Sequence, residues 1–403
     1  MEDQEMINQI LKDKIKKIAD RIYNDVVVNR RHLHSNPELS FQEYETFNFI
    51  ASKLNEAGIE FQKMAGTGLV ALVKGDLLSN AVVALRADMD ALTITEANDV
   101  PYKSNKAGVM HACGHDVHTA SLLGTAQILT ELKNEFGGTV KLIFQPAEEK
   151  YPGGASMMIK EGVLENSKPQ TIIGQHVMPD LETGKVGFCC GKYMASNDEI
   201  YVTVHGKGGH GAQPHENVDP VLIASHIIIA LQQIVSRIAN PKNPSVLSFG
   251  KVIANGSVNV IPDEVYMEGT FRTMDETWRE QAHQSMKKMA EGIAISMGAT
   301  CTFKILKGYP FLINEERLTK KIQEFGVDYL GKENVVDLDI WMAAEDFAYY
   351  SQIIDSCFYR LGTGNKNLGI TSSLHTPTFN IDENALKVST GLMAYITLKQ
   401  LGN

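Results

Sequence analysis

Short apolar runs alternate with amphipathic helical segments along the first half of the chain. The runs are rich in Val, Ile and Leu and are bounded by glycine, aspartate or other polar residues, which is typical of strands buried on both faces of a sheet. They are residues 68–73, 81–85, 139–144 and 171–175. Apolar residues at helical spacing occupy residues 11–29, 42–57, 118–133 and 154–161. This alternation predicts a three-layer α/β domain with a mainly parallel sheet.

A different pattern follows Gly187. Strand-like and helical segments here succeed one another in the order β-α-β-β-α-β, which is the split βαβ or ferredoxin-like unit. They are residues 199–205, 219–237, 245–253, 264–272, 276–297 and 300–306. Because such a unit is self-contained, we predict an inserted α+β domain at residues 191–307. Residues 1–190 and 308–403 would then form one discontinuous catalytic domain.

Composition narrows the class of protein. The chain has 403 residues, of which 43% are hydrophobic and 21% charged, as in ordinary soluble globular proteins. Its net charge of -10 disfavours nucleic-acid binding, which needs a basic face. We expect no membrane-spanning helix, because no stretch approaches the roughly 18 to 20 apolar residues that one needs. We expect no secretory signal, because the N-terminal segment is acidic and then amphipathic. Five scattered cysteines do not form a disulfide framework, so we predict a cytoplasmic protein.

The densest cluster of chemically active residues is MHACGHDVHTAS, residues 110–121. It offers five groups that can bind a metal: His111, Cys113, His115, Asp116 and His118. A single glycine separates Cys113 from His115, so a loop can turn both side chains toward one ion. Thiolate and imidazole together suit a divalent metal such as zinc. The alternative is a helix-capping loop with histidines present by chance.

Two adjacent carboxylates, Glu148 and Glu149, follow an apolar strand in FQPAEE, residues 144–149. In a metal-assisted hydrolase, one carboxylate holds the ion while its neighbour takes a proton from water. A solvated acidic pair at a helix start is an equally good interpretation of this motif alone.

Further polar residues stand at predicted strand ends and in a late loop. His176 follows the strand at 171–175, and His375 lies in SSLHTPTFNID, residues 372–382. Each histidine is weak evidence alone, but with the Cys/His and Glu pairs they could surround one or two ions. Asp88 and Asp90, in RADMDAL at residues 86–92, are candidates for orienting a ligand histidine. Simple solvation of a strand end is the competing interpretation.

The inserted domain carries a glycine-rich turn, GKGGHGAQPH, at residues 206–215. It lacks the Gly-Lys-Ser/Thr ending of a phosphate loop, so nucleotide binding is disfavoured. His210 on this turn could instead stabilise an oxyanion in a neighbouring site. Arg272 could grip a substrate carboxylate through its planar fork, although a surface arginine is as good an interpretation. Arg272 and the polar residue Asn259 flank the predicted strand at residues 264–272.

These motifs, in this order, resemble the M20 metallopeptidase family. The resemblance is to its amidohydrolase branch, which includes hippurate hydrolases, N-acetyl-amino-acid deacetylases and auxin-conjugate hydrolases. It extends over nearly the whole chain, from HLHSNPELSFQE at residues 32–43 to His375 and beyond.

The resemblance implies a role for each matching residue. Two divalent ions (zinc, manganese, cobalt or nickel) would be held by Cys113, His115, Glu149, His176 and His375. Glu148 would be the general acid/base, and His210 would stabilise the tetrahedral intermediate. In the family that histidine can come from a partner subunit, because the smaller domain is also a dimerisation and lid domain. Asn259 and Arg272 resemble contacts to the substrate carboxylate.

In other M20 branches a His-x-Asp motif begins the site, and Asp88 stands where that histidine would be. The resemblance therefore gives Cys113 the bridging role.

The resulting prediction is a metal-dependent amidohydrolase that releases the acyl group of N-acyl amino acids as a carboxylic acid. A homodimer, or a dimer of dimers, is implied with it. The nearest alternative is a dipeptidase or aminopeptidase of the same family, which would need an acidic residue to bind an ammonium group. A non-catalytic metal-dependent binding protein is the alternative from another class.

Overall fold

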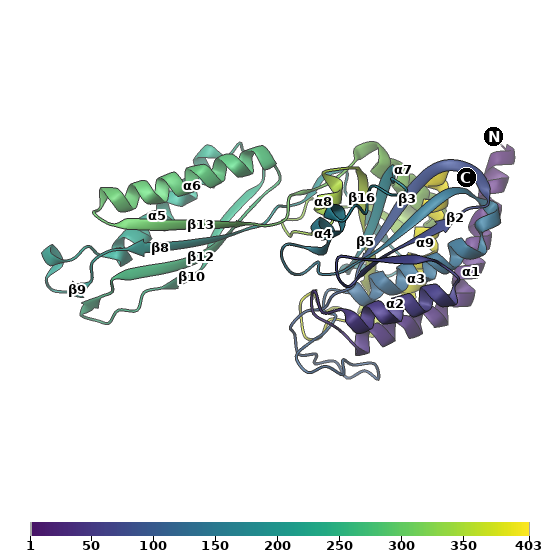
Figure 1. Ribbon diagram of the computed structural model, residues 1–403, viewed down its shortest axis with the longest axis horizontal. Helices are drawn as coiled ribbons and strands as arrows, with labels where there is room; N and C mark the ends of the chain where they lie inside the picture. The colour runs from purple at the N-terminus through teal and green to yellow at the C-terminus, as the bar shows by residue number, and fades with distance from the viewer. Residues whose placement is uncertain (1, 403) are drawn as a thin grey trace. The chain divides into compact units, whose positions relative to one another are not determined.

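The computed structural model describes residues 2–402, and side chains for residue 6 and residues 8–402 (Figure 1). The chain divides into two compact units. Unit 1 consists of Met1–Gly191, Ile313–Asp339 and Tyr349–Asn403, and unit 2 consists of Lys192–Leu312 and Ile340–Ala348. Each unit has its own hydrophobic core.

Unit 1 is built on an eight-stranded mixed sheet with the order β1-β2-β4-β3-β5-β16-β6-β15. The four central strands, β4, β3, β5 and β16, are parallel, whereas β1 and β2 run antiparallel at one side. The strands are β1 Phe61–Met64, β2 Gly68–Lys74, β3 Leu77–Asp88, β4 Gly137–Gln145, β5 Thr171–Glu182, β6 Val186–Phe188, β15 Val335–Asp337 and β16 Asp355–Gly364.

Helices cover this sheet, and α3 is the most deeply buried of those in unit 1, packed between α1 and α9 (Figure 1). The central strands are largely buried and require such cover on both faces, because a parallel sheet exposes neither face to water. The helices of unit 1 are α1 Glu2–Ser35, α2 Tyr44–Glu56, α3 His115–Glu131, α4 Gly154–Lys160, α7 Glu316–Leu330 and α9 Asn384–Leu401. The short helix α8, Ala348–Ser351, begins at the unit boundary.

The carboxyl ends of the parallel strands meet at one edge of the sheet. Asp88 at the end of β3 pairs with Gln145 at the end of β4, and β5 runs parallel beside β3. Polar side chains at these ends are therefore brought together, as in other open α/β sheets. Helix α3 begins at His115, so its first turn supplies further polar groups.

Unit 2 is an antiparallel four-stranded sheet with the order β10-β12-β8-β13, covered by two helices. Strand β8 alternates as its sequence predicts, with Ile200, Val202 and Val204 fully buried. The side chains of Asp219 and Asp275 cap the N-termini of the two helices by accepting hydrogen bonds from backbone N–H groups of their first turns. The elements are β8 Asp198–His205, α5 Pro220–Gln233, β10 Ser245–Ile253, β12 Glu264–Thr273, α6 Glu276–Ser296 and β13 Thr300–Lys307.

The element order β8-α5-β10-β12-α6-β13 is the ferredoxin-like order that the sequence predicts. Together with the mainly parallel sheet of unit 1, it confirms the predicted fold class. Short strands complete the description: β7 Gly191–Met194, β9 Gly209–His210, β11 Val260–Ile261 and β14 Leu312–Asn314.

One helical segment of the described chain, Pro220–Ile238, is long and apolar enough to cross a membrane by length and composition alone. The sequence pattern did not predict such a segment. It comprises α5 and a π-helical turn, and its residues Ile223, Ile227 and Leu231 pack into the core of unit 2. Since core helices of soluble proteins pass the same test, this is weak evidence for a membrane span.

Candidate metal centre

The five predicted ligand residues come from four separate segments of unit 1, and the fold brings them together. Cys113 lies in the loop before α3, and His115 is the first residue of α3. His176 lies within β5, beside β3. Glu149 follows β4, and His375 lies in the loop before α9.

The five side chains form two groups that share one thiol. Cys113, His115 and His176 have ligand atoms within 4.8 Å of one another, and so do Cys113, Glu149 and His375. The Sγ atom of Cys113 is 3.3 Å from Nε2 of His176 and 3.3 Å from Nε2 of His375. Nε2 of His375 is in turn 3.6 Å from Oε1 of Glu149. Cys113 is thus placed to contribute to two ions.

Hydrogen bonds at the far side of two rings leave their Nε2 atoms directed into the cluster. Nδ1 of His176 lies 2.8 Å from the Val177 carbonyl oxygen, which can only accept, so Nδ1 carries the proton. Nδ1 of His115 lies 3.2 Å from Oδ1 of Asp90. Within the described chain, the buried Nε2 of His115 has no hydrogen-bond partner. A neutral imidazole held in this way is the form that binds a metal.

Asp90 also fixes the glutamate pair. Its two oxygens accept the backbone N–H groups of Glu148, at 3.0 Å, and Glu149, at 2.9 Å. Ala147, just before the pair, has a φ of 52°, a conformation that costs energy for a residue with a side chain. Its N–H donates to Oε1 of the buried Glu43 at 2.8 Å. The turn that presents Glu148 and Glu149 is therefore held by two carboxylates.

Asp88 organises the neighbouring part of the site through His118. The Val177 N–H donates to Nε2 of His118 at 3.0 Å, so the ring proton is on Nδ1 and is donated to Oδ1 of Asp88 at 2.5 Å. Arg86 forms an ion pair with the other oxygen of Asp88 at 2.6 Å. Both nitrogens of His118 are thus occupied, and this residue joins Asp88 to β5.

Two other metal-capable residues of the 110–121 motif turn away from the cluster. Asp116 accepts hydrogen bonds from Arg30 and His34 of α1. His111 belongs to none of the groups of metal-capable residues in the described chain. Burial lowers the pKa of His111 to about 4, so this ring is neutral.

Left-handed backbone conformations shape the loops of the cluster. Gly114, between Cys113 and His115, has a φ of 82°, and a Cβ there would lie 2.4 Å from Cγ2 of Val177. His375 has a φ of 60° and is not a glycine. Its N–H donates to the Ala112 carbonyl at 2.9 Å, which ties its loop to the segment that carries Cys113. Strain of this kind concentrates at functional sites.

The electrostatics of the cluster suit a bound cation. Burial and the neighbouring Glu149 raise the pKa of the Cys113 thiol well above its usual value. Burial opposes the charged form of His115, but Asp88 and Cys113 beside it raise its pKa. A divalent cation reverses this logic, since it stabilises a thiolate and displaces the proton of an imidazole. The donor set of thiolate, imidazoles and carboxylate therefore fits a divalent metal such as zinc.

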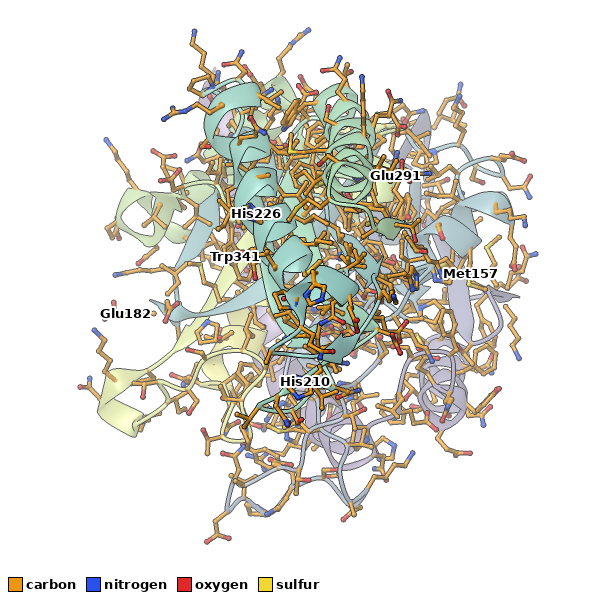
Figure 2. All side chains as sticks on the ribbon, turned by 90° about the vertical axis from the view of Figure 1, so that its left-hand side faces the viewer. Met157, Glu182, His210, His226, Glu291 and Trp341 are labelled. Atoms are coloured by element: carbon orange, nitrogen blue, oxygen red, sulfur yellow. The ribbon has the colours of Figure 1, made fainter. Side chains whose placement is uncertain are left out.

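The predicted residues of unit 2 fall into two places. His210 on β9 pairs with Val260 of β11, and the Gly211 N–H donates to the Asn259 carbonyl at 2.8 Å. His210 and Asn259 therefore lie on one ribbon, where the His210 side chain is exposed (Figure 2).

Asn259 lies just before β12, which begins at Glu264. Arg272 lies near the other end of β12, eight residues beyond Glu264. At ~3.3 Å per residue this separation is about 26 Å. Unit 2 thus does not bring Arg272 to His210 and Asn259.

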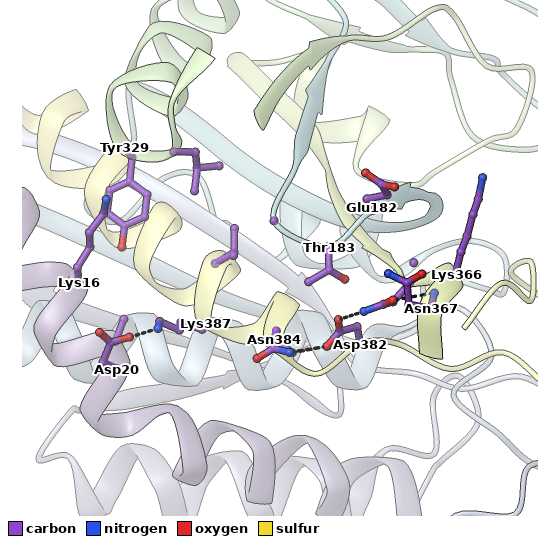
Figure 3. Close-up of a pocket in the computed structure, with 16 residues that line it drawn as sticks. Lys16, Asp20, Glu182, Thr183, Tyr329, Lys366, Asn367, Asp382, Asn384 and Lys387 are labelled. Carbon is purple, nitrogen blue, oxygen red and sulfur yellow. Dashed lines mark hydrogen bonds and ion pairs between the residues drawn. The ribbon is translucent and has the colours of Figure 1, made fainter. Parts of the chain in front are cut away.

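A polar hollow of about 920 Å³ in unit 1 lies apart from the metal-binding groups (Figure 3). None of the clustered ligand residues lines it. Some of its polar groups are paired: Lys387 forms an ion pair with Asp20, and Asp382 accepts hydrogen bonds from the amides of Asn365 and Asn384 at 2.7 and 2.9 Å. This hollow is therefore separate from the candidate metal centre.

Comparison with known proteins identifies the family. The family model for peptidase family M20/M25/M40 matches residues 84–399. The chain belongs to this family. The resemblance drawn from the motifs is confirmed.

Relatives of known name cover most of the chain. It is 43% identical to an N-acyl-L-amino acid amidohydrolase of Geobacillus stearothermophilus, over 75% of this chain and 81% of that one. It is 41% identical to an N-acetyl-L-cysteine deacetylase of Bacillus subtilis, over 92% and 87%. The crystal structure of the Bacillus subtilis YXEP protein, described as a dinuclear metal-binding peptidase from the M20 family, has a TM-score of 0.82. It is 37% identical and covers 95% of this chain and 99% of that one. The three names describe hydrolysis of an amide bond, which in a peptidase is the peptide bond.

Proposed function

We propose that this enzyme hydrolyses the amide bond of N-acyl amino acids and uses two divalent metal ions to do so. The observation that carries the proposal is the sharing of Cys113 between two groups of ligand atoms, with Glu148 beside them. The amidohydrolase and deacetylase relatives support the same reaction.

One ion would be held by Cys113, His115 and His176, and the other by Cys113, Glu149 and His375. A mixed set of sulfur, nitrogen and oxygen donors accepts zinc, manganese, cobalt or nickel. When bound, such ions lower the pKa of a water molecule and polarise a carbonyl group.

Glu148 is the proposed proton carrier. Its carboxylate lies within 4.8 Å of the ligand atoms of His115 and Glu149, and the side chain is buried. It accepts a proton from the attacking water and then delivers that proton to the amide nitrogen as the C–N bond breaks. Asp90 holds the backbone of this residue, so the carboxylate remains directed at the site.

His210 is proposed to donate a hydrogen bond to the carbonyl oxygen as that oxygen gains charge. Asn259 and Arg272 are proposed contacts for the substrate carboxylate. An N-acyl amino acid is about two residues long, or roughly 7 Å, much less than the separation of Arg272 from Asn259 within one chain. If both residues bind the same substrate, one of them comes from a second copy of the chain.

We therefore propose a homodimer formed through unit 2. Strand β10 is at the edge of its sheet, and α5 packs against the same side of the unit. Apolar side chains are exposed there: Leu222 and Ile229 on α5 are 51% and 73% exposed, and Val252 on β10 is 52% exposed. A second copy would cover this apolar surface and pair with the open edge. A dimer of dimers is the larger assembly of the same kind.

The cytoplasm is the proposed location. All five cysteines are free, as expected in a reducing compartment.

A substrate panel tests the proposed reaction. Purified enzyme would be freed of metal and assayed with zinc, manganese, cobalt or nickel on N-acetyl-methionine, hippurate and a dipeptide with a free amino group. We expect metal-dependent release of the free amino acid from an N-acyl substrate and little cleavage of the dipeptide. Preferential cleavage of the free-amine dipeptide would instead support the peptidase alternative. Equal activity without metal would contradict the proposal.

A further inference from the structure

A cluster of buried charged residues lies beside the candidate metal centre, away from the atoms that would bind ions. It consists of Arg30 and His34 on α1, Asp116 on α3, and Glu96 in the segment after β3. All four residues are buried, with Arg30 at 0% exposure. Burying charge is costly unless each group is paired, so such a cluster requires an explanation.

Hydrogen bonds link the four residues of the cluster to one another. Oδ2 of Asp116 accepts a hydrogen bond from Nε of Arg30 at 2.8 Å. The same oxygen lies 2.8 Å from Nδ1 of His34. Nε2 of the same imidazole lies 3.1 Å from Oε1 of Glu96. Nδ1 also lies 3.3 Å from Nη2 of Arg30, so the imidazole of His34 bridges Arg30 and Asp116 to the Glu96 segment.

The cluster also reaches the loop that carries His375. The Nη atoms of Arg30 lie 3.4 Å from Oδ1 of Asn380 and 3.4 Å from Oε1 of Glu383. The Glu96 segment contributes as well: the Ala97 N–H donates to the Pro377 carbonyl at 2.8 Å. Asn98 Nδ2 donates to the Phe379 carbonyl at 2.8 Å.

One guanidinium thus joins the two segments that complete the ligand groups. Asp116 directly follows His115 and lies three residues after Cys113, whereas Asn380 lies five residues after His375. The loop with His375 contains no helix or strand between β16 and α9 apart from the 3-10 turn Lys366–Leu368. Because this loop has little regular backbone hydrogen bonding, the position of His375 depends on the contacts that Arg30 and the Glu96 segment make with the loop.

We propose that Arg30 and His34 are positioning residues for the metal centre. They set the distance between the Cys113–His115 turn and His375, and so determine how well the group of Cys113, Glu149 and His375 holds its ion. This inference rests on the proposed two-metal function. It assigns a role to residues in the first helix, far from the ligands in sequence.

The test measures metal binding and not turnover. Arg30→Met, Arg30→Lys and His34→Gln would be compared with wild type for metal stoichiometry, for the dissociation constant of each ion, and for the absorption spectrum of the cobalt-loaded protein. Loss of such outer partners typically lowers metal affinity about 10- to 100-fold. We expect that loss for one of the two ions in Arg30→Met, with a changed cobalt spectrum. Arg30→Lys keeps the charge but loses the fork, so it should recover only part of the affinity.

Arg31→Met is the matched control. Arg31 stands next in the chain, pairs with Glu383 at 2.6 Å, and lies 4.9 Å above the same Tyr102 ring as Arg30, but it is not bonded to Asp116. Its metal affinities and cobalt spectrum should match wild type, whatever small change in melting temperature it shows.

The outcomes separate this inference from the proposed function. If Arg30→Met does not fold, Arg30→Lys and His34→Gln decide the question, because they alter fewer contacts. Folded variants that bind both ions with wild-type affinity and spectrum would overturn the positioning role. A wild-type enzyme that binds two ions but cleaves no N-acyl amino acid would overturn the proposed function and leave the positioning result intact.

Discussion

Replacement of Cys113 by alanine should weaken both metal sites at once. Its Sγ atom lies 3.3 Å from Nε2 of His176 in one group and 3.3 Å from Nε2 of His375 in the other. Residues that only support a ligand account for about 10- to 100-fold in metal affinity, so a direct ligand should account for at least about 100-fold per ion. At about 1.4 kcal/mol for each factor of ten, this is at least about 2.8 kcal/mol for each ion.

The same loss should appear in stability. An ion present at 100 times its dissociation constant stabilises the folded protein by about 2.7 kcal/mol. A hundredfold weaker site at that concentration is only half occupied and gives about 0.4 kcal/mol. The zinc-dependent rise in melting temperature should therefore largely disappear in Cys113→Ala.

Metal titration followed by elemental analysis measures the effect, with Cys190→Ser as the control. Cys190 is in the same unit and is partly buried, but it belongs to none of the metal-capable groups of the described chain. The control should bind two ions with wild-type affinity. If Cys113→Ala lost only one ion and kept the other at full affinity, the sharing of this thiol would be refuted. Retention of both ions would remove Cys113 from the centre altogether.

Three further predictions concern the surroundings of the site and the second unit. Gly114→Ala should lower both melting temperature and metal content, because its φ of 82° and a Cβ placed 2.4 Å from Val177 are unfavourable; a variant with wild-type metal content would contradict this. Burial, with the charge of Asp90, raises the pKa of Glu43 to about 7 from 4.5. The folded state therefore retains a proton that the unfolded chain releases, and the free energy of unfolding should fall by up to about 3 kcal/mol as pH rises between these values. Urea unfolding of wild type and Glu43→Gln at each pH tests this, and parallel curves would refute it. Asp219→Ala should cost unit 2 about 1 kcal/mol, since Oδ1 caps α5 through Val221 N–H at 2.8 Å; unchanged urea unfolding would contradict the capping role.

The spacing of apolar residues predicts the bounds of a strand well where an alternating or apolar pattern covers its whole length. The alternation at residues 199–205 gives a strand that the structure extends by one residue to Asp198–His205, and the predicted strand 245–253 coincides with β10. Boundaries are poorer where polar residues continue a regular element. Strand β5 is predicted to end at residue 175 but runs to Glu182, because its pairing with β16 continues past the apolar run. Helix α1 likewise extends from Glu2 to Ser35, well beyond the apolar stretch at 11–29.

The candidate site is more predictable in its residues than in their orientations. The five predicted ligand residues converge because the carboxyl ends of parallel strands share one edge. Sequence spacing does not distinguish His118, whose two nitrogens are hydrogen-bonded to Asp88 and Val177, from a candidate ligand such as His115. The difference depends on which side of the first turn of α3 faces the sheet. Arg30 gives no signal either, because its carboxylate partners lie more than 80 residues away in the chain.

Unit 2 illustrates a further limit of sequence reasoning. Asn259 and Arg272 are close in sequence, and both were predicted to contact the substrate carboxylate. The extended length of β12 separates them, because each residue of a strand adds about 3.3 Å to the distance. Only the structure therefore shows that β12 carries Arg272 about 26 Å beyond Glu264, at the end of the strand that follows Asn259.

Glu148→Gln tests the central claim most directly, because it removes a proton acceptor and keeps the shape of the side chain. Metal content and the turnover of an N-acyl amino acid would be measured on the same preparation. We predict two ions per chain, as in wild type, and a kcat lower by about 100- to 10,000-fold, which is the usual contribution of general acid–base catalysis. Near-normal turnover with both ions bound would contradict the account.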